Sequence, residues 1–170
     1  MADNIILIGF MGVGKGRTAR ALAALTERFT VDTDDLIESM VKMKIRQIFS
    51  SQGEARFRQL EQRTADWLET CVSGTIISTG GGFFKVSNIR RLGQVVYLHS
   101  SLEDILTVMR SYPNAEKRFK KRPLLQDLAR AEALFAERLP QYRQAADMEI
   151  AVAGRTTADI AAEIASCFRQ

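Results

Sequence analysis

Residues 9–18 read GFMGVGKGRT, and this stretch decides the fold that the rest of the chain must build. Up to Lys15 it matches the phosphate-binding pattern G-x-x-x-x-G-K, which a Ser or Thr normally completes. The apolar residues 4–8 before it predict a buried strand, and the amphipathic residues 15–28 after it predict a helix. Glycines between a strand and a helix bring backbone N–H groups around an anion, and the helix adds its positive end. The stretch therefore predicts a nucleotide site in which Lys15 reaches the β- and γ-phosphates.

Short apolar runs alternate with helical patterns along the rest of the chain, and this alternation predicts an α/β protein with the P-loop kinase fold. The predicted strands lie at residues 4–8, 29–32, 75–78, 94–98 and 148–152. The predicted helices lie at about 15–28, 34–43, 46–49, 53–71, 101–110, 127–146 and 157–168. We expect three layers, α/β/α, around a central five-stranded parallel sheet in a single domain over residues 1–170. Residues 111–123 are expected to form a loop, and Pro140 is expected to kink or break its helix.

The composition is that of an ordinary globular protein, with 46% hydrophobic residues, 26% charged residues and a net charge of +4. No apolar run approaches the ~18 residues that a membrane span needs, and the first residues lack the basic start of a signal peptide. We therefore expect a cytoplasmic protein with no membrane partner. Cys71 and Cys167 have no metal-ligand spacing, and the single His99 excludes a multi-histidine metal site. The basic run KRFKKR at residues 117–122 accompanies no recognisable nucleic-acid-reading module, so no nucleic-acid partner is expected.

Gly16 stands where the phosphate-binding pattern asks for a hydroxyl that helps to hold Mg²⁺. Thr18 lies two residues further on and would point to a different face of the helix, so it is a poor substitute. Phosphate oxygens, waters and a nearby carboxylate can still hold the metal, because Mg²⁺ commonly keeps several waters. We therefore predict weakened metal affinity with activity retained. The alternative is a nucleotide-binding protein that has lost catalysis.

Chemically unusual residues follow the predicted strands, at the edge where parallel sheets bind ligands. Asp32 and Asp34 follow the second strand, on one side of an extended segment, where a carboxylate can orient the nucleophile of a phosphoryl transfer. The alternative is that Asp34 or Asp35 only caps the next helix. Three glycines, residues 80–82, follow the third strand and would let the backbone approach a ligand closely, unless they form only a flexible turn.

Together these blocks resemble the shikimate kinase family. The resemblance covers the whole chain and rests, besides the loop, on Val31-Asp32-Thr33-Asp34, Gly53-Glu54-x-x-Phe57-Arg58, Thr79-Gly80-Gly81-Gly82 and Arg122-Pro123-Leu124-Leu125, in the family's order and at nearly its spacing. It implies transfer of the γ-phosphoryl group of ATP to the 3-hydroxyl of shikimate. The products would be shikimate 3-phosphate and ADP, on the route through chorismate to the aromatic amino acids. It also implies Mg²⁺ as cofactor, ATP and shikimate as small-molecule partners, and a monomer.

The resemblance also assigns roles to individual residues. Catalysis is assigned to Lys15, to Asp34 as the base, and to Arg122, which would close over the phosphates in a mobile lid at about 111–123. Asp32 would hold the metal. The nucleotide would be bound by Gly12, Val13, Gly14, Lys15, Gly16, Arg17, Arg110, Arg122 and Arg155, with Arg110 and Arg155 flanking the adenine. Shikimate would be bound by Asp34, Arg58, Gly80, Gly81, Gly82 and Arg138, partly within a helical region at about 34–62.

Plainer interpretations stay open for several of these residues. Arg58 lies four residues after Glu54 and three before Glu61, a spacing typical of an exposed ion pair. The resemblance instead implies that Arg58 and Arg138 grip the shikimate carboxylate through their planar guanidinium groups. Arg110 and Arg155 are also compatible with ordinary helix-end cations. The alternative activity is a kinase for another small hydroxy acid, such as gluconate.

Replacing Gly16 by Ser should restore the missing hydroxyl and lower the Mg²⁺ concentration needed for half-maximal rate. The measurement is the rate as a function of Mg²⁺ at saturating substrates. An unchanged Mg²⁺ curve would rule out a weakened metal site at residue 16.

Overall fold

A five-stranded sheet lies at the centre of the molecule, in the order β2-β3-β1-β4-β5, and all neighbouring strands are parallel. The computed structural model describes residues 3–120 and 123–168. The strands are β1 (Ile5–Ile8), β2 (Thr30–Asp32), β3 (Ile76–Ser78), β4 (Gln94–His99) and β5 (Met148–Ala151). In register, Ile6 of β1 lies between Ile77 of β3 and Val95 of β4. These three side chains are fully buried, as continuous apolar strands in a doubly covered sheet require.

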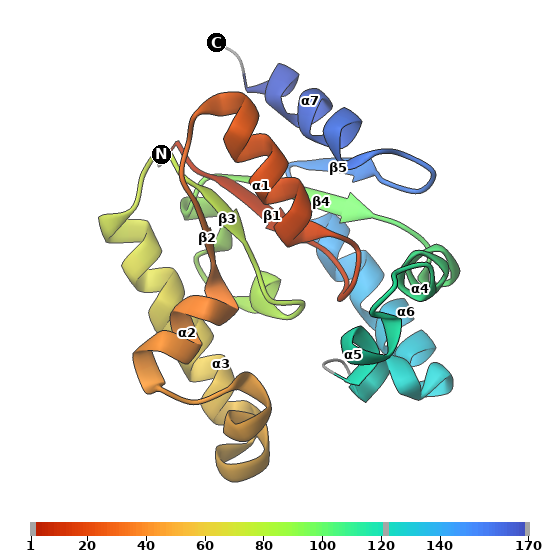
Figure 1. Cartoon of the computed structure of the whole chain (residues 1–170). Coiled ribbons are helices and arrows are strands. Elements are labelled where there is room, and N and C mark those ends of the chain that lie inside the picture. The colour runs from red at the N-terminus through yellow and green to blue at the C-terminus, as the bar shows by residue number, and fades with distance from the viewer. Residues whose placement is uncertain (1–2, 121–122, 169–170) are drawn as a thin grey trace.

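Helices cover both faces of this sheet, so the predicted three-layer α/β/α fold is confirmed. The helices are α1 (Lys15–Thr26), α2 (Thr33–Val41), α3 (Ile45–Cys71), α4 (Leu102–Arg110), α5 (Ala115–Lys120), α6 (Leu128–Ala145) and α7 (Thr157–Cys167). Short 3-10 helices are η1 (Phe83–Lys85), η2 (Ile89–Arg91) and η3 (Pro123–Gln126). Figure 1 shows α1 and α7 packed side by side on one face of the sheet, with α6 on the opposite face.

In the region between β4 and β5, the expectation of a loop is wrong, and of the kink or break expected at Pro140 the break is excluded. The segment expected to be a loop contains the short helix α5, which its Ala, Glu, Lys and Phe residues permit. Pro140 does not break α6, which continues on both sides of it. Buried neighbours one turn apart explain the continuity, because Arg138 and Tyr142 both donate to the Gly81 carbonyl and hold the helix in place.

The molecule has two separate hydrophobic clusters. The larger one surrounds the sheet. The smaller one joins α2 to α3 through Ile37, Ile48, Phe57 and Leu60, with Val41, Met43 and Ile45 packed against it. Gly53 interrupts α3, where its φ is 80° and its conformation is not helical. The short helix and the long helix predicted from sequence are therefore the two parts of α3 on either side of Gly53. This left-handed conformation is one that glycine adopts without strain.

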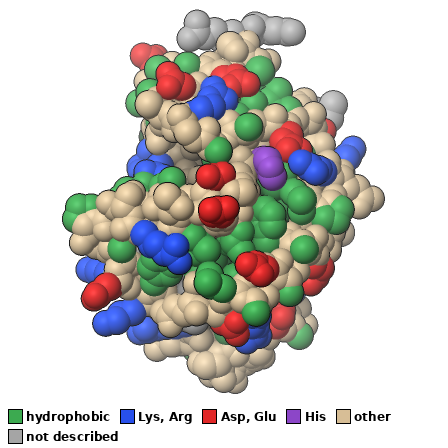
Figure 2. Space-filling view, turned by 90° about the vertical axis from the view of Figure 1, so that its right-hand side faces the viewer, with side chains coloured by type: hydrophobic (Ala, Val, Ile, Leu, Met, Phe, Trp, Pro, Cys, Tyr) green, Lys and Arg blue, Asp and Glu red, His purple; other side chains and the backbone are tan. Residues whose placement is uncertain are grey.

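None of the helices in residues 3–120 and 123–168 has the length and apolar character that a membrane span requires. Figure 2 views the molecule from the side of α4 and α5. On this face, acidic and basic side chains are interspersed around hydrophobic ones instead of forming one basic surface.

The buried side chain of Asn4 ties together the chain segments at the end of the sheet opposite the phosphate-binding loop. Its Nδ2 donates to the carbonyls of Val72 and Leu92 at 2.9 and 2.8 Å, and its Oδ1 accepts from the Thr75 N–H at 3.0 Å. Asn4 is 1% exposed, so water cannot replace these bonds.

Replacing Asn4 by Ala should lower the free energy of unfolding by about 2–4 kcal/mol, because it leaves buried carbonyl and N–H groups without partners. Urea unfolding measures this. The control is Asp3→Ala next to it, which removes only an exposed ion pair with Arg28 and should cost less than about 1 kcal/mol. Equal effects of the two substitutions would contradict a structural role for the Asn4 side chain.

Candidate active site

The loop after β1 has the geometry of a phosphate cradle. Gly12 and Gly14 have φ values of 87° and 108°, which favour glycine, and Gly14 is the N-cap of α1. The Lys15 side chain is buried and folds into the loop, where Nζ donates to the carbonyls of Gly9 at 2.7 Å and Phe10 at 3.1 Å. An ammonium group and a helix N-terminus therefore meet at one point, as binding of a polyphosphate requires.

The two aspartates after β2 have different environments. Asp32 caps α2, since its Oδ1 accepts from the N–H groups of Asp34 at 2.9 Å and Asp35 at 3.4 Å, and its Oδ2 accepts from the Ser78 hydroxyl at 2.8 Å. Asp34 does not cap the helix. Burial raises the pKa of the Asp34 carboxyl to about 7, and the negative charges of Asp32 and Glu61 add to this rise. Lys15 lowers the same pKa, which places the loop ammonium within electrostatic range of Asp34.

The three glycines after β3 bring the predicted substrate-binding residues together, because each glycine faces a different one. A Cβ at Gly80 would lie 2.5 Å from Asp34 Oδ1, and a Cβ at Gly82 would collide with the guanidinium of Arg58. At Gly81 it would lie 3.5 Å from Arg138 Nη1 and 3.7 Å from the backbone nitrogen of Met11 in the loop. The absence of side chains at residues 80 and 82 therefore permits the close approach of Asp34 and Arg58, whereas residue 81 has room for a Cβ.

Arg58 is held by two glutamates of the same helix. It donates to Glu54 Oε1 through Nε at 3.1 Å and Nη2 at 2.8 Å, and to Glu61 Oε2 through Nη1 at 2.5 Å. Glu61 is 1% exposed, so its pair with Arg58 is largely buried, whereas the pair with Glu54 is the exposed kind that the spacing also allowed. Burial disfavours the charge on Arg58, but the two carboxylates outweigh it and hold the pKa of Arg58 above its ordinary value. Burial raises the pKa of Glu61, although Arg58 opposes the rise.

Arg138 of α6 reaches the same backbone from the other side. Its Nη1 donates to the Gly81 carbonyl at 3.0 Å, and the Tyr142 hydroxyl donates to the same oxygen at 2.6 Å. Burial raises the pKa of Tyr142 to about 12, so this phenol is a donor at neutral pH. Two guanidinium groups, of Arg58 from α3 and Arg138 from α6, thus lie beside the same short backbone segment.

Polar atoms without partners mark this cluster as a ligand site. Within residues 3–120 and 123–168, three buried side-chain N or O atoms lack a hydrogen-bond partner: Asp34 Oδ1, Glu61 Oε1 and Arg138 Nε. All three belong to the cluster around residues 80–82. Because buried polar groups are almost always paired in a folded protein, these atoms point to a polar molecule as their partner.

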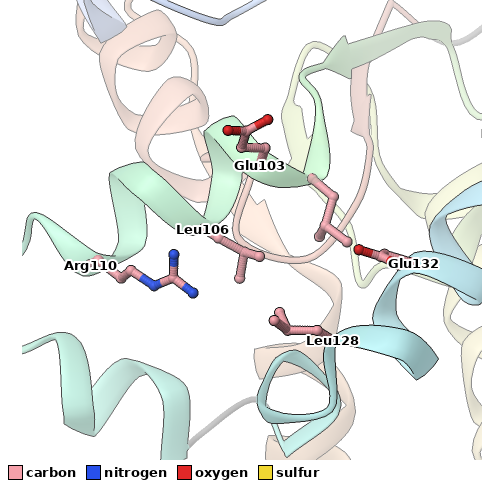
Figure 3. Close-up of a pocket in the computed structure, with 6 residues that line it drawn as sticks. Glu103, Leu106, Arg110, Leu128 and Glu132 are labelled. Carbon is pink, nitrogen blue, oxygen red and sulfur yellow. The ribbon is translucent and has the colours of Figure 1, made fainter.

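Three arginines predicted to bind the nucleotide have other contacts, and two of them, Arg110 and Arg155, are those predicted to flank the adenine. Arg17 stacks over the Tyr112 ring, with 5.0 Å from Cζ to the ring centroid. Arg155 donates to the Ala151 carbonyl at 3.0 Å and pairs with Glu163 at 2.5 Å. Arg110 reaches into a pocket of about 250 Å³ between α4 and α6, lined by Leu102, Glu103, Leu106, Leu128 and Glu132 (Figure 3). Their assignment to the nucleotide stays a prediction, as does that of Arg122, which lies outside the described residues.

The residues around Gly16 fit a magnesium ion held mainly by phosphate. In the described part of the chain, no group of three or more His, Cys, Asp or Glu side chains is arranged to hold a metal. Asp32 and Ser78 nevertheless place a carboxylate and a hydroxyl beside the phosphate cradle, and these are oxygen ligands of the kind Mg²⁺ prefers. The site thus suits an ion that enters with the nucleotide and keeps several waters.

Sequence reasoning missed several residues that complete the site. Glu61 was predicted only as an exposed partner of Arg58. Its burial could have been found, because it shares the helical spacing of the apolar residues Phe57, Leu60 and Leu68 and so lies on their buried face. Thr33 and Tyr142 had no such signal. Their roles depend on the fold, since Thr33 Oγ1 accepts from the Gly80 N–H at 3.0 Å and Tyr142 donates to the next residue's carbonyl.

Comparison with known proteins agrees with this geometry. The family model "Shikimate kinase" matches residues 11–169. The chain belongs to the shikimate kinase family. A shikimate kinase of Helicobacter hepaticus is 39% identical over 142 residues, which cover 84% of this chain and 82% of the relative. One from Geobacter sulfurreducens is 38% identical over 175 residues, covering 98% and 91%.

A solved shikimate kinase has the same fold over nearly the whole chain. The structure from Acinetobacter baumannii in complex with shikimate superposes with a TM-score of 0.84 at 32% identity, covering 98% of this chain and 93% of the other. The predicted family, fold and class of small-molecule kinase are therefore confirmed. The gluconate-type and non-catalytic alternatives are not favoured by these matches.

Replacing Asp34 by Asn should stabilise the protein above neutral pH. The Asp34 pKa is raised in the folded state, so the stability that its neutral form supplies is present near pH 4 and is lost as the pH rises through about 7. The Asn variant should gain up to about 4 kcal/mol at pH 8.5 and almost nothing near pH 4. Urea unfolding at both pH values measures this, and an equal gain at both would show that Asp34 is not perturbed.

Proposed function

We propose that the chain transfers the γ-phosphoryl group of ATP to the 3-hydroxyl of shikimate, giving shikimate 3-phosphate and ADP. The observation that carries this proposal is the convergence of one buried carboxyl and two arginines on the backbone of residues 80–82, next to the phosphate cradle. A carboxylated polyol offers a carboxylate for the arginines and hydroxyl groups for the Asp34 carboxyl. Membership of the shikimate kinase family supports the same substrate.

Arg58 and Arg138 are proposed to bind the shikimate carboxylate. Arg58 is fixed by Glu54 and Glu61, and Arg138 is fixed by the Gly81 carbonyl, so both guanidinium groups are positioned before substrate arrives. Pre-positioned donors lower the entropy loss of binding and hold the reacting hydroxyl in line with the phosphate.

Asp34 is proposed to accept the proton of the attacking hydroxyl. The hydroxyl oxygen forms a bond to the γ-phosphorus, the bond from that phosphorus to the bridging oxygen of ADP breaks, and the proton passes to the Asp34 carboxylate. A pKa of about 7 makes this carboxylate a stronger base than an ordinary aspartate, while it is still largely ionised above neutral pH.

Lys15 and the loop N–H groups are proposed to stabilise the charge on the phosphates. Lys15 already lies inside the loop, bound to the carbonyls of Gly9 and Phe10, and would exchange these partners for phosphate oxygens. Mg²⁺ bound with ATP would neutralise charge on the β- and γ-phosphates, with Asp32 beside it. Closure of residues 111–123, with Arg122, is proposed to exclude water that would otherwise accept the phosphoryl group.

A coupled ADP-release assay with shikimate tests the proposal. The native chain should turn over shikimate in the presence of Mg²⁺, and Asp34→Asn should lower kcat by about 10²–10⁴-fold. Asp35→Asn is the matched control, since Asp35 is exposed and should keep near-native activity. Turnover of gluconate with none of shikimate would reverse the substrate assignment, and strong turnover by Asp34→Asn would remove this residue as the base.

Replacing Gly82 by Ala should displace Arg58, because the added methyl group collides with its guanidinium. We expect kcat/KM for shikimate to fall about 10- to 100-fold, mainly through KM, while KM for ATP is unchanged. In an Arg58→Ala background the same substitution should have little further effect. Additive losses in the double variant would mean that Gly82 acts independently of Arg58.

A further inference from the structure

The Ser78 hydroxyl borders the space beside Gly16. A Cβ built at residue 16 would lie 3.8 Å from Ser78 Oγ. Ser78 is the last residue of β3, the strand hydrogen-bonded to β1, so its side chain stands at the sheet edge from which the phosphate-binding loop also starts. A hydroxyl from a different strand is therefore close to where the loop pattern normally places one.

The hydrogen bonds of Ser78 leave its oxygen available. Its hydroxyl proton is donated to Asp32 Oδ2 at 2.8 Å, and a hydroxyl that donates its proton keeps lone pairs for a cation. Asp32 is fixed in turn, because its other oxygen accepts from two N–H groups of α2. The pair thus forms a rigid set of oxygens, and Ser78 is 3% exposed, so its rotamer is confined by the surrounding chain.

We propose that the Ser78 hydroxyl, held by Asp32, supplies the oxygen toward Mg²⁺ that Gly16 lacks. The inference rests on the proposed use of Mg²⁺ with ATP, and it names the residue that lets a loop without Ser or Thr keep its metal. The other group near residue 16 has the wrong chemistry for this role. Arg20 Nη1 lies 3.5 Å from the same Cβ position, and a guanidinium is a cation with no lone pair to offer.

The test is the binding of Mn²⁺, a spectroscopic substitute for Mg²⁺, to the complex of the full chain with ADP. Free Mn²⁺ is measured by electron paramagnetic resonance, so the readout does not depend on turnover. Ser78→Ala should raise the Mn²⁺ Kd about tenfold or more, and Ser78→Thr, which keeps the hydroxyl, should stay close to native. The ADP Kd measured in EDTA should be the same in all variants, since the effect is on the metal.

The decisive comparison is between Gly16→Ser in two backgrounds. In the Ser78→Ala chain it should restore most of the lost Mn²⁺ affinity, whereas in the native chain it should give a smaller gain, because the two hydroxyls serve one ion. Equal gains in both backgrounds would overturn the proposal and leave Ser78 as a support for Asp32 only.

Arg20→Met is the control for the other neighbour, and it should preserve or strengthen Mn²⁺ binding. A loss as large as that of Ser78→Ala would also overturn the proposal. Shikimate-dependent ADP release by the native chain is measured in parallel. If shikimate-dependent ADP release is present but Gly16→Ser gives equal gains in Mn²⁺ affinity in both backgrounds, the metal inference fails and the proposed function stands. If ADP release is absent, the proposed function itself fails.

Discussion

The close approach of charged side chains to the bare backbone of residues 80–82 is the contact on which the site depends. Asp34, Arg58 and Arg138 come from three helices, and each meets a different glycine of this segment. A side chain at residue 80 or residue 82 would displace Asp34 or Arg58, whereas a Cβ at residue 81 would stand in ordinary van der Waals contact. The position of β3 beside β1 then sets the distance between this cluster and the phosphate-binding loop.

The same cluster concentrates buried charge in a small volume, which opposes folding. Asp34 and Glu61 have raised pKa values because burial disfavours their ionised forms, and each has an oxygen without a partner among the described residues. Such groups destabilise a folded chain unless a ligand pairs with them. The stability of the domain comes instead from the apolar sheet and from bonds such as those of Asn4.

The sequence predicted the elements and the site residues that have local signals. Alternating apolar runs and helical spacing located every strand to within about two residues, because burial on both faces imposes that pattern. The loop motif, the aspartate pair and the triple glycine could be recognised as site segments because each follows the end of a predicted strand. Continuity of α6 through Pro140 was not predictable, because it depends on bonds to Gly81, a residue distant in sequence. The hydrogen bond between Ser78 and Asp32 was not predictable either, because it joins two neighbouring strands and the sequence does not specify their order or register.

The separate hydrophobic cluster between α2 and α3 has a consequence for how the molecule can move. Ile37, Ile48, Phe57 and Leu60 pack on one another and belong to a different cluster from the residues around the sheet. The two helices are also joined to the larger cluster, because Ala65 and Leu68 of α3 belong to it and Leu36 of α2 packs against it. A tilt of the smaller cluster would therefore have to bend α3 between its two halves. Because Asp34 and Arg58 lie on these two helices, such a tilt would carry the proposed base and one of the proposed carboxylate-binding arginines together and would keep the distance between them.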